Sequence, residues 1–446
     1  MSSISTTKLV SVGIVCTFFS IAWFLEPWVR SASGYELGNR RRVVSVVKLE
    51  LMMTLVNIFI YHQLLAYYTP MEEDCKADRW ILSKWRERYS SGLLVFFFFA
   101  QLIYYMYYAP LWLQWLLFDL TSIACGVWTN LFAFVLGFWI VNTTRPYLMV
   151  LIPPIKYLID LVSQVDYLRR LIFERRCQIR FTITISLLLS FIMWAGCDFI
   201  QVKERTIHVK NLSAERGQLR LAVISDIHAG ASVYKEQVAN VVDRLLSLDV
   251  DAVLIVGDMV DGPVSEVADR VQPMWQLPRR VPTFFVTGNH DYYYGDAMEW
   301  TSLYKKMGIH VLNNNHTLFK GVCLAGVNDI SSGKMGIKNH ESNATIAIKY
   351  CPKDSSTILM AHNPATITEI PKIDLEQIDL ILSGHTHAGQ FYVVVPLVYW
   401  MLPYFYGLYE LPFGNGKLMV SAGTLYQGPN MKMLGMSEIW IVNLVK

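Results

Sequence analysis

The sequence has few cysteines, and their spacing excludes two classes of protein. Its 446 residues contain 7 cysteines and no Cys-x-x-Cys pair, so neither a disulfide framework nor a zinc ribbon is expected. Most of these cysteines are expected to be ordinary small apolar residues. Cys323 and Cys351 lie in the second half of the chain, and they can form a disulfide if that half lies in an oxidising compartment.

Charged residues are also scarce. Lys, Arg, Asp and Glu make up 17% of the chain, and the net charge of +3 comes from mixed signs without a basic block. Nucleic acid is therefore not expected as a partner. Hydrophobic residues reach 53%, which is too high for a wholly soluble chain, so part of the protein is expected to lie in a lipid bilayer.

Five apolar runs have close to the roughly 20 residues needed to cross a bilayer. They occupy residues 9–25, 51–69, 92–113, 122–141 and 181–199. The third run is longer than one crossing, and we expect Pro110 to end or kink its helix. A few polar residues within the runs are expected to hydrogen bond between helices: His62, Gln63, Gln101 and Asn130. Residues 1–200 are therefore predicted to form a membrane domain with about five transmembrane helices.

Basic residues between the runs predict the orientation of the chain in the membrane. Segments 70–91 and 142–180 are rich in Lys and Arg and share one side in a five-span protein, so both are expected in the cytoplasm. The part after residue 200 is then extracytoplasmic or lumenal, which is compatible with three glycosylation sequons, at Asn211, Asn315 and Asn343. Four basic residues in the first connection argue against this orientation, but the other two segments together outweigh them: Arg40, Arg41, Arg42 and Lys48.

After residue 200 the pattern changes to short β-branched runs that alternate with helical patterns. Strands are predicted within 219–225, 251–258, 283–289, 356–362, 379–385, 417–423 and 437–445, and a helix over 234–248. Such alternation indicates a layered α/β domain over residues 201–446, with its functional site at the carboxyl ends of the strands.

Each of the first five predicted strands ends in polar residues that can bind a metal. In chain order the clusters are "SDIHAG", "GDMVDG", "GNHD", "MAHNP" and "GHTH", which contain Asp226, His228, Asp258, Asn289, His290, His362, His385 and His387. Alternate residues of an extended chain face the same side, so Asp-x-His and His-x-His can each present two ligands together. Oxygen and imidazole ligands without thiolate suit Mn, Fe, Zn or related ions.

A pair of such ions is the usual requirement of metal-assisted phosphoester hydrolysis. A carboxylate must bridge the two ions to offset their repulsion, and we predict Asp258 for this position. His290 is placed to donate a proton or a hydrogen bond to the leaving oxygen. Asp261 and Asp291 lie beside the predicted ligands and are expected to orient them.

In this order the clusters resemble the signature of the calcineurin-like metallophosphoesterases. The resemblance covers about 218–446, and "GHTHAGQ" with "YGLYEL" looks like a subgroup that contains bacterial membrane-associated phosphoesterases. It implies an α/β metallophosphoesterase domain, built as a layered β-sandwich flanked by helices, and two divalent metal ions. By resemblance, one ion is held by Asp226, His228, Asp258 and His387, and the other by Asp258, Asn289, His362 and His385, with His290 near the leaving group. Ala388 departs from the family, in which many members have glycine, and is expected to alter the strain of its turn.

We therefore predict a membrane-anchored hydrolase of phosphoesters, and leave open whether it acts on monoesters or diesters. The aromatic run 391–413 is either a core strand with its loop or a wedge in the membrane interface, and the wedge would favour a phospholipid or other membrane-borne substrate. One alternative is a non-enzymatic membrane protein whose domain binds metal or a phosphorylated ligand. The other is a transporter, against which the scarcity of paired intramembrane charges argues.

Overall fold

The computed structural model describes residues 6–32, 34–68, 76–212, 217–294, 297–335, 337 and 340–446. The chain divides into two compact units. A helical unit consists of Met1–Phe24, Ser45–Tyr104 and Leu120–Ile192, and a sheet unit consists of Leu25–Val44, Tyr105–Asp119 and Met193–Lys446.

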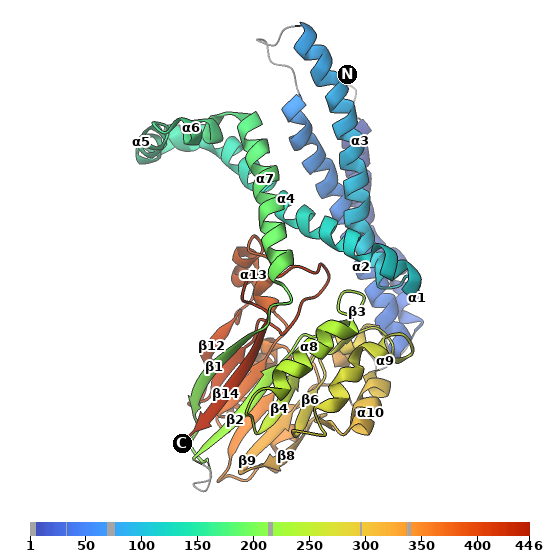
Figure 1. The fold of residues 1–446 in the computed structure, drawn as a ribbon, viewed down its shortest axis with the longest axis vertical. Coiled ribbons are helices and arrows are strands. Elements are labelled where there is room, and N and C mark those ends of the chain that lie inside the picture. Colours follow the sequence, from blue (N-terminus) through green and yellow to red (C-terminus); the bar gives the residue numbers. More distant parts are fainter. Residues whose placement is uncertain are drawn as a thin grey trace. The chain divides into compact units, whose positions relative to one another are not determined.

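The first half of the chain folds into long helices (Figure 1). These are α1 (Thr6–Arg30), α2 (Gly34–Leu65), α3 (Lys76–Met106), α4 (Leu111–Leu151) and α7 (Arg175–Gly196), with the shorter α5 (Pro153–Val162) and α6 (Asp166–Phe173). Among the described residues, five helices are long and apolar enough to cross a membrane: Val12–Arg30, Glu36–Leu65, Trp80–Met106, Leu111–Leu151 and Arg175–Gly196. The predicted number of spans is confirmed. Residues 69–75, which belong to the predicted second span and the connection after it, lie outside the described residues.

Pro110 separates two helices, as predicted. Helix α3 ends at Met106 and α4 begins at Leu111, and the carbonyl of Pro110 accepts hydrogen bonds from the first turn of α4, from Leu113 N at 2.9 Å and Gln114 N at 3.1 Å. Proline is tolerated before the first turn of a helix because no backbone donor is needed there.

Three of the polar residues within the spans bond between helices, which confirms the prediction for them. Gln63 Oε1 of α2 accepts from Arg175 Nη2 of α7. Gln101 Oε1 of α3 accepts from Asn57 Nδ2 of α2 at 3.0 Å, and Asn130 Nδ2 of α4 donates to Ser190 Oγ of α7 at 2.9 Å. In hydrocarbon these groups have no water to bond, so such pairs help the helices to associate.

The sheet unit contains two six-stranded sheets and a small two-stranded one. The first has the order β1-β14-β2-β4-β6-β7 and the second β12-β13-β11-β10-β9-β8, while β3 pairs with β5. The strands are β1 (Gln201–His208), β2 (Gln218–Ile224), β3 (Ala229–Gly230), β4 (Ala252–Val256), β5 (Val260–Asp261), β6 (Thr283–Val286), β7 (His310–Val311), β8 (Asn315–Phe319), β9 (Val322–Gly326), β10 (Ser356–Met360), β11 (Leu380–Ser383), β12 (Gly407–Glu410), β13 (Lys417–Val420) and β14 (Glu438–Val445). All seven strands predicted from the sequence are present.

Alternate residues of the central strands face different cores. Leu254 of β4 packs between the two sheets with Ile358 of β10, whereas Ile255 faces outward, against Val241 of α8. In the second sheet, Leu359 of β10 likewise faces outward, into a third core. Strands buried on both faces read as continuous apolar runs, which is why they were recognisable in the sequence.

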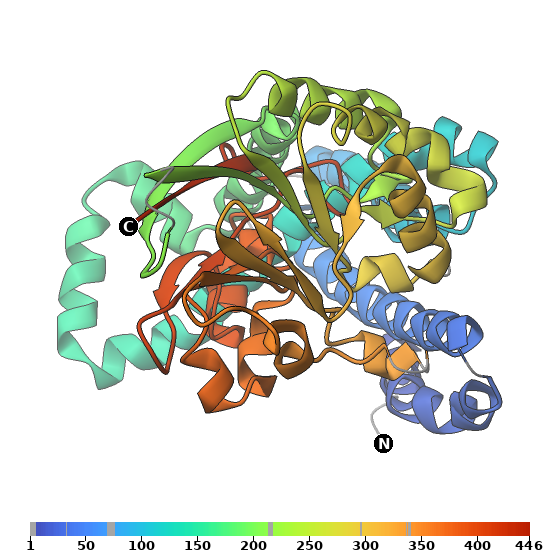
Figure 2. The same cartoon turned by 90° about the horizontal axis from the view of Figure 1, so that it is seen from below.

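Helices cover both outer faces of the sandwich, which confirms the predicted layered α/β fold (Figure 2). Those on the first sheet are α8 (Lys235–Leu246), α9 (Val264–Val271) and α10 (Ala297–Met307), and those on the second are α11 (Ala344–Ile348) and α12 (Lys372–Leu375). A last short helix, α13 (Val395–Met401), follows the final histidine cluster.

Candidate metal centre

The predicted ligands follow strands that run in parallel. Strands β2, β4 and β6 are parallel neighbours in the first sheet, and β10 and β11 are parallel neighbours in the second. The carboxyl ends of parallel strands meet at one edge of a sheet. Stacking the two sheets brings both edges together, and the ligand side chains gather there.

Seven of the eight predicted site residues form a buried cluster in which three groups each have ligand atoms within 4.8 Å of one another. These groups are Asp226, His228 and His387; His228, Asp258 and His290; and Asp258, His362 and His385. The remaining site residue, the buried Asn289, precedes His290.

The carboxylate of Asp258 lies between the two outer groups. Its Oδ2 is 3.7 Å from His228 Nε2 on one side and 3.2 Å from His362 Nε2 on the other. On the first side, His387 Nε2 lies 3.1 Å from His228 Nε2 and 3.3 Å from Asp226 Oδ1. One carboxylate oxygen of Asp258 therefore faces both His228 and His362.

The donor atoms fit a pair of divalent cations. Asn289 Oδ1 and His362 Nε2 are buried without a hydrogen-bond partner among the described residues. A buried polar atom without a partner is costly, and a cation at this edge would supply one. Clusters of this kind, rich in His and Asp, are typical of a binuclear metal site, and their oxygen and nitrogen atoms suit several metals.

The backbone at the site is strained. Five of the seven predicted metal ligands have a positive φ, namely Asp226 (55°), His228 (52°), Asp258 (51°), His385 (71°) and His387 (49°). For residues other than glycine this conformation costs about 1–2 kcal/mol each, and it persists only where the surrounding structure enforces it. Ala388 has a φ of 48°, so the alanine at this departure from the family does add strain to the turn.

Two glycines of the motifs make room for the carboxylates. A Cβ on Gly288 would lie 2.1 Å from Asp258 Oδ1, and a Cβ on Gly384 would lie 2.3 Å from Asp226 Oδ2. Neither approach is possible for another residue, because real Cβ atoms do not come this close to another atom. This explains why "GNHD" and "GHTH" both begin with glycine.

Asp261 orients two histidines at once. Its Oδ1 accepts from His228 Nδ1 at 3.0 Å and from His290 Nδ1 at 2.6 Å, which leaves the Nε2 atoms of both rings for the site. Burial acts to lower the pKa of His228, but the carboxylates of Asp261 and its neighbours outweigh burial and raise this pKa to about 10. Burial acts to raise the pKa of Asp261, but the two histidines hold it well below its usual range.

Asp291 holds the backbone of the site. Its Oδ2 accepts from Gly288 N at 2.7 Å and from Asp258 N at 3.1 Å. Burial, together with the neighbouring Asp258 carboxylate, raises the pKa of Asp291 to about 8. The orienting roles expected for Asp261 and Asp291 agree with these contacts.

Two buried residues that support the site were not predicted. Lys432 Nζ donates to Gly423 O at 2.8 Å, and Glu438 Oε1 accepts from Ala422 N at 2.8 Å. The loop they hold packs against Asp226, since Leu425 N donates to Asp226 O at 3.2 Å. In the sequence, Lys432 and Glu438 are each a single charged residue in a mainly apolar stretch, and this pattern could have indicated a buried charge.

Asp329 was also missed. It is a buried acid that follows β9, and its charge acts on His362. Strand β9 itself was not predicted, so the polar pair Asn328 and Asp329 after it was not recognised as a sixth cluster at a strand end.

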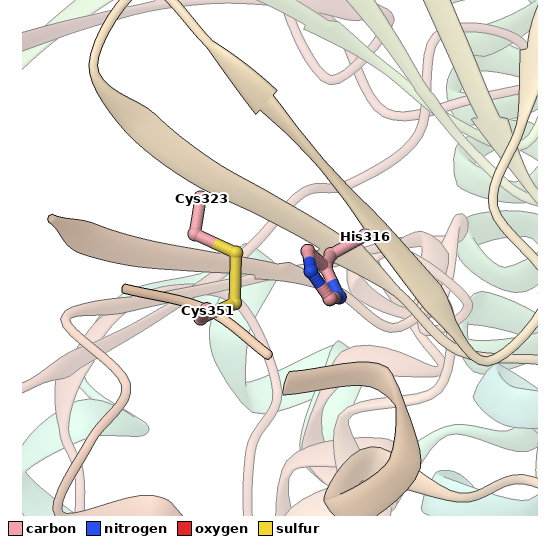
Figure 3. Close-up of side chains that lie close together, drawn as sticks. All are labelled: His316, Cys323 and Cys351. Atoms are coloured by element: carbon pink, nitrogen blue, oxygen red, sulfur yellow. A yellow bond between two sulfur atoms is a disulfide. The ribbon is translucent and has the colours of Figure 1, made fainter. Parts of the chain in front are cut away.

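A further group of potential ligands is not a metal site as it stands. His316 lies close to Cys323 and Cys351, but the two sulfurs are bonded to each other as the disulfide that their position allowed (Figure 3). His316 Nδ1 lies 2.8 Å from Ala347 O.

The buried His and Asp clusters at the facing edges of the two sheets fit the metallophosphoesterase fold, and sequence comparison identifies the class of the domain. Residues 219–389, which include every predicted site residue, match the family of calcineurin-like phosphoesterases. The chain therefore carries a calcineurin-like metallophosphoesterase domain.

Relatives with similar sequences come from animals and bacteria. The chain is 35% identical to a transmembrane protein with metallophosphoesterase domain from Danio rerio, over 54% of this chain and 56% of the relative. It is 33% identical to a putative metallophosphoesterase of Caenorhabditis elegans, over 61% and 58%, and 33% identical to an uncharacterized metallophosphoesterase of Helicobacter pylori strain J99, over 55% and 64%. The chain thus spans little more than half the length of the animal relatives. Together with its five apolar helices, this likeness identifies a multi-pass membrane protein.

We expect Asp258→Asn to weaken metal binding by at least about tenfold, because the neutral amide removes the charge between the two histidine groups. Metal content of the purified protein after dialysis, measured by mass spectrometry, checks this. Asp269→Asn, at an exposed residue paired with Lys235, is the matched control and should keep its metal. A full metal complement in Asp258→Asn would show that this carboxylate is not a ligand.

Proposed function

We propose that the protein is a membrane-anchored hydrolase of phosphoesters that uses two divalent metal ions. The observation that carries the proposal is the convergence of five strand ends on one buried cluster, with Asp258 between two histidine groups. Bound there, two cations would acidify a water molecule and neutralise charge on the phosphoryl oxygens.

The ligands divide between the two ions as the family resemblance implies. One ion takes Asp226, His228, Asp258 and His387, and the other takes Asp258, Asn289, His362 and His385. The proximity of His387 to Asp226 and His228, and of His362 and His385 to Asp258, supports this division. Mn, Fe and Zn all suit the donor set.

His290 is the proposed proton donor to the leaving oxygen. The hydrogen bond from its Nδ1 to Asp261 fixes the ring and turns Nε2 toward the cluster, and its backbone N–H donates to Asp258 Oδ1 at 2.8 Å. Asp261 thereby keeps the ring in one orientation for proton transfer.

Purified protein supplied with Mn²⁺ should hydrolyse a chromogenic phosphomonoester or phosphodiester. His290→Ala should keep its metal but lower kcat by about 10²–10⁴, the range for loss of a general acid. His310→Ala, at an exposed histidine away from the motifs, should leave kcat unchanged. The rates come from absorbance assays with both substrates, which also separate monoesterase from diesterase activity.

The alternative is a non-enzymatic domain that binds metal or a phosphorylated ligand. It would be favoured if the protein binds two metal ions but hydrolyses neither substrate, and if Asp258→Asn leaves its cellular function intact.

The substrate is proposed to be a phospholipid or another membrane-borne phosphoester. The run 391–413 contains α13, which has no buried residue, and β12, which pairs with β13. In α13, Tyr399 is 68% and Trp400 is 82% exposed. Aromatic side chains of this kind favour the membrane interface. Val395 of α13 packs beside Ala388, so this helix adjoins the turn that carries His385 and His387.

Replacing Trp400 and Tyr399 with serine should reduce turnover of a phosphoester in liposomes by about tenfold and leave turnover of a soluble chromogenic substrate unchanged, because only liposome docking needs the apolar face. Tyr350→Ser, at another exposed aromatic residue, is the matched control. Equal loss with both substrates, or with neither, would count against the membrane-borne substrate.

The phosphoesterase domain is proposed to be extracytoplasmic or lumenal. The Cys323–Cys351 disulfide supports an oxidising compartment, and the asparagines of the three sequons are exposed. The sheet unit also contains Leu25–Val44 and Tyr105–Asp119, which include the connections after the first and third spans. In a protein with five spans, these two connections lie on the same side of the membrane as the segment after the fifth span, which forms the phosphoesterase domain. Arg40, Arg41 and Arg42 belong to the first of these connections, and each of them donates a hydrogen bond to a residue of the sheet unit, so these positive charges have partners on the side of the domain.

Cell-expressed protein should shift to lower mass with an N-glycosidase, and each of Asn211→Gln, Asn315→Gln and Asn343→Gln should remove part of that shift if its site is used. In intact cells, maleimide should label Cys323 and Cys351 only after reduction. No mass change in the wild type, together with maleimide labelling that requires no reductant, would reverse the orientation.

A further inference from the structure

An arginine from the beginning of α2 lies against the tyrosines that follow His290. Arg42 Nη2 donates to the hydroxyl of Tyr294 at 3.3 Å. Its guanidinium carbon lies 5.1 Å from the centre of the Tyr293 ring and 5.9 Å from that of Tyr294. All three residues belong to the sheet unit.

The same tyrosines adjoin His290 and form a wall beside the metal centre. The His290 ring centre is 4.9 Å from that of Tyr293 and 6.1 Å from that of Tyr294. Tyr107, from the connection between α3 and α4, stacks on Tyr294 at 5.6 Å. Three segments far apart in the sequence therefore build this wall, and Arg42 provides its positive charge.

The charge of Arg42 lacks an anionic partner among the residues that the structure describes. Its neighbour Arg40 pairs with Glu36, whereas no carboxylate of a described residue lies within salt-bridge distance of Arg42. Its Nε is buried and forms no hydrogen bond to any described residue. Aromatic rings attract the cation but do not accept its N–H groups in the way an oxyanion does. The partly buried guanidinium of Arg42 therefore has an N–H donor that can bind an anion.

We propose that Arg42 binds a second anionic group of the substrate, next to the phosphoester at the metal centre. The substrate class is then a phosphoester that carries another phosphate, because the planar fork of arginine matches phosphate oxygens. The inference rests on the proposed function for the position of the first phosphoester. Arg42 lies outside the 219–389 segment that matches the family, so it is additional to the metal-binding motifs of that segment.

The test compares two probes that cannot be hydrolysed, propane bisphosphonate and propylphosphonate, on the metal-loaded full-length protein in detergent. Calorimetry gives both dissociation constants for the wild type, Arg42→Gln, Arg42→Met and the control Arg41→Gln. Arg41 precedes Arg42 on α2 and donates to the backbone carbonyl of Lys334.

The wild type and Arg41→Gln should bind the bisphosphonate at least about tenfold more tightly than the monophosphonate, as an added charge-assisted pair allows. Both Arg42 variants should lose this preference. Arg42→Met should not lower the melting temperature, since it removes an unpaired charge, whereas a merely structural arginine would lower it. The proposal is overturned if the wild type has no preference, or if the Arg42 variants that fold retain it.

Failure of this inference is distinguishable from failure of the proposed function, because the measurement detects binding and needs no turnover. If the protein binds the bisphosphonate more tightly in a way that depends on Arg42 but hydrolyses no phosphoester, the anion site is supported and the proposed hydrolase function is rejected. If the protein hydrolyses phosphoesters but binds both probes equally, the hydrolase function is supported and the anion site is rejected. Vesicles with phosphatidylinositol phosphate, compared with phosphatidylinositol vesicles, distinguish a lipid-borne second phosphate from a soluble one.

Discussion

The rest of the structure depends on the interaction between the carboxylate of Asp258 and the two histidines that it faces, His228 and His362. One oxygen of this carboxylate faces histidines from both sheets, so it joins the two halves of the sandwich at their common edge. Gly288 must be glycine to admit this carboxylate, Asp291 holds the backbone of Asp258, and Asp261 fixes the rings that face it. Burial of so many ionisable groups is unfavourable unless they are paired, and cations bound at this edge would complete the pairing.

The predicted ligands illustrate what local pattern can reveal. Strands β2, β4, β6, β10 and β11 are buried on both faces, so they appear as apolar runs, and the polar residue after each run marks the sheet edge. Strands β1 and β8 have exposed and polar residues, as strands at the edge of a sheet often do, and the sequence carried no comparable signal for them. Missing β9, next to β8, also concealed Asp329.

Arg42 shows why the remainder of the site was not predictable. It is one of three consecutive arginines, and only the packing of α2 against the turn after His290 distinguishes it from its neighbours. From the sequence, the three were evidence about membrane orientation, and a contact across some 250 residues leaves no local pattern. The motif thus predicts the chemistry of the centre, whereas its surroundings depend on the tertiary fold.

The disulfide near His316 has a consequence for how the metal centre is measured. The sulfurs of Cys323 and Cys351 lie within 4.8 Å of an imidazole nitrogen of His316 in the disulfide-bonded structure, and a reducing preparation converts them to two thiols. Thiolates and imidazole together form a soft ligand set with a preference for zinc. Zinc bound there would be counted together with zinc in the Asp and His cluster, so metal stoichiometry is best measured on the oxidised protein.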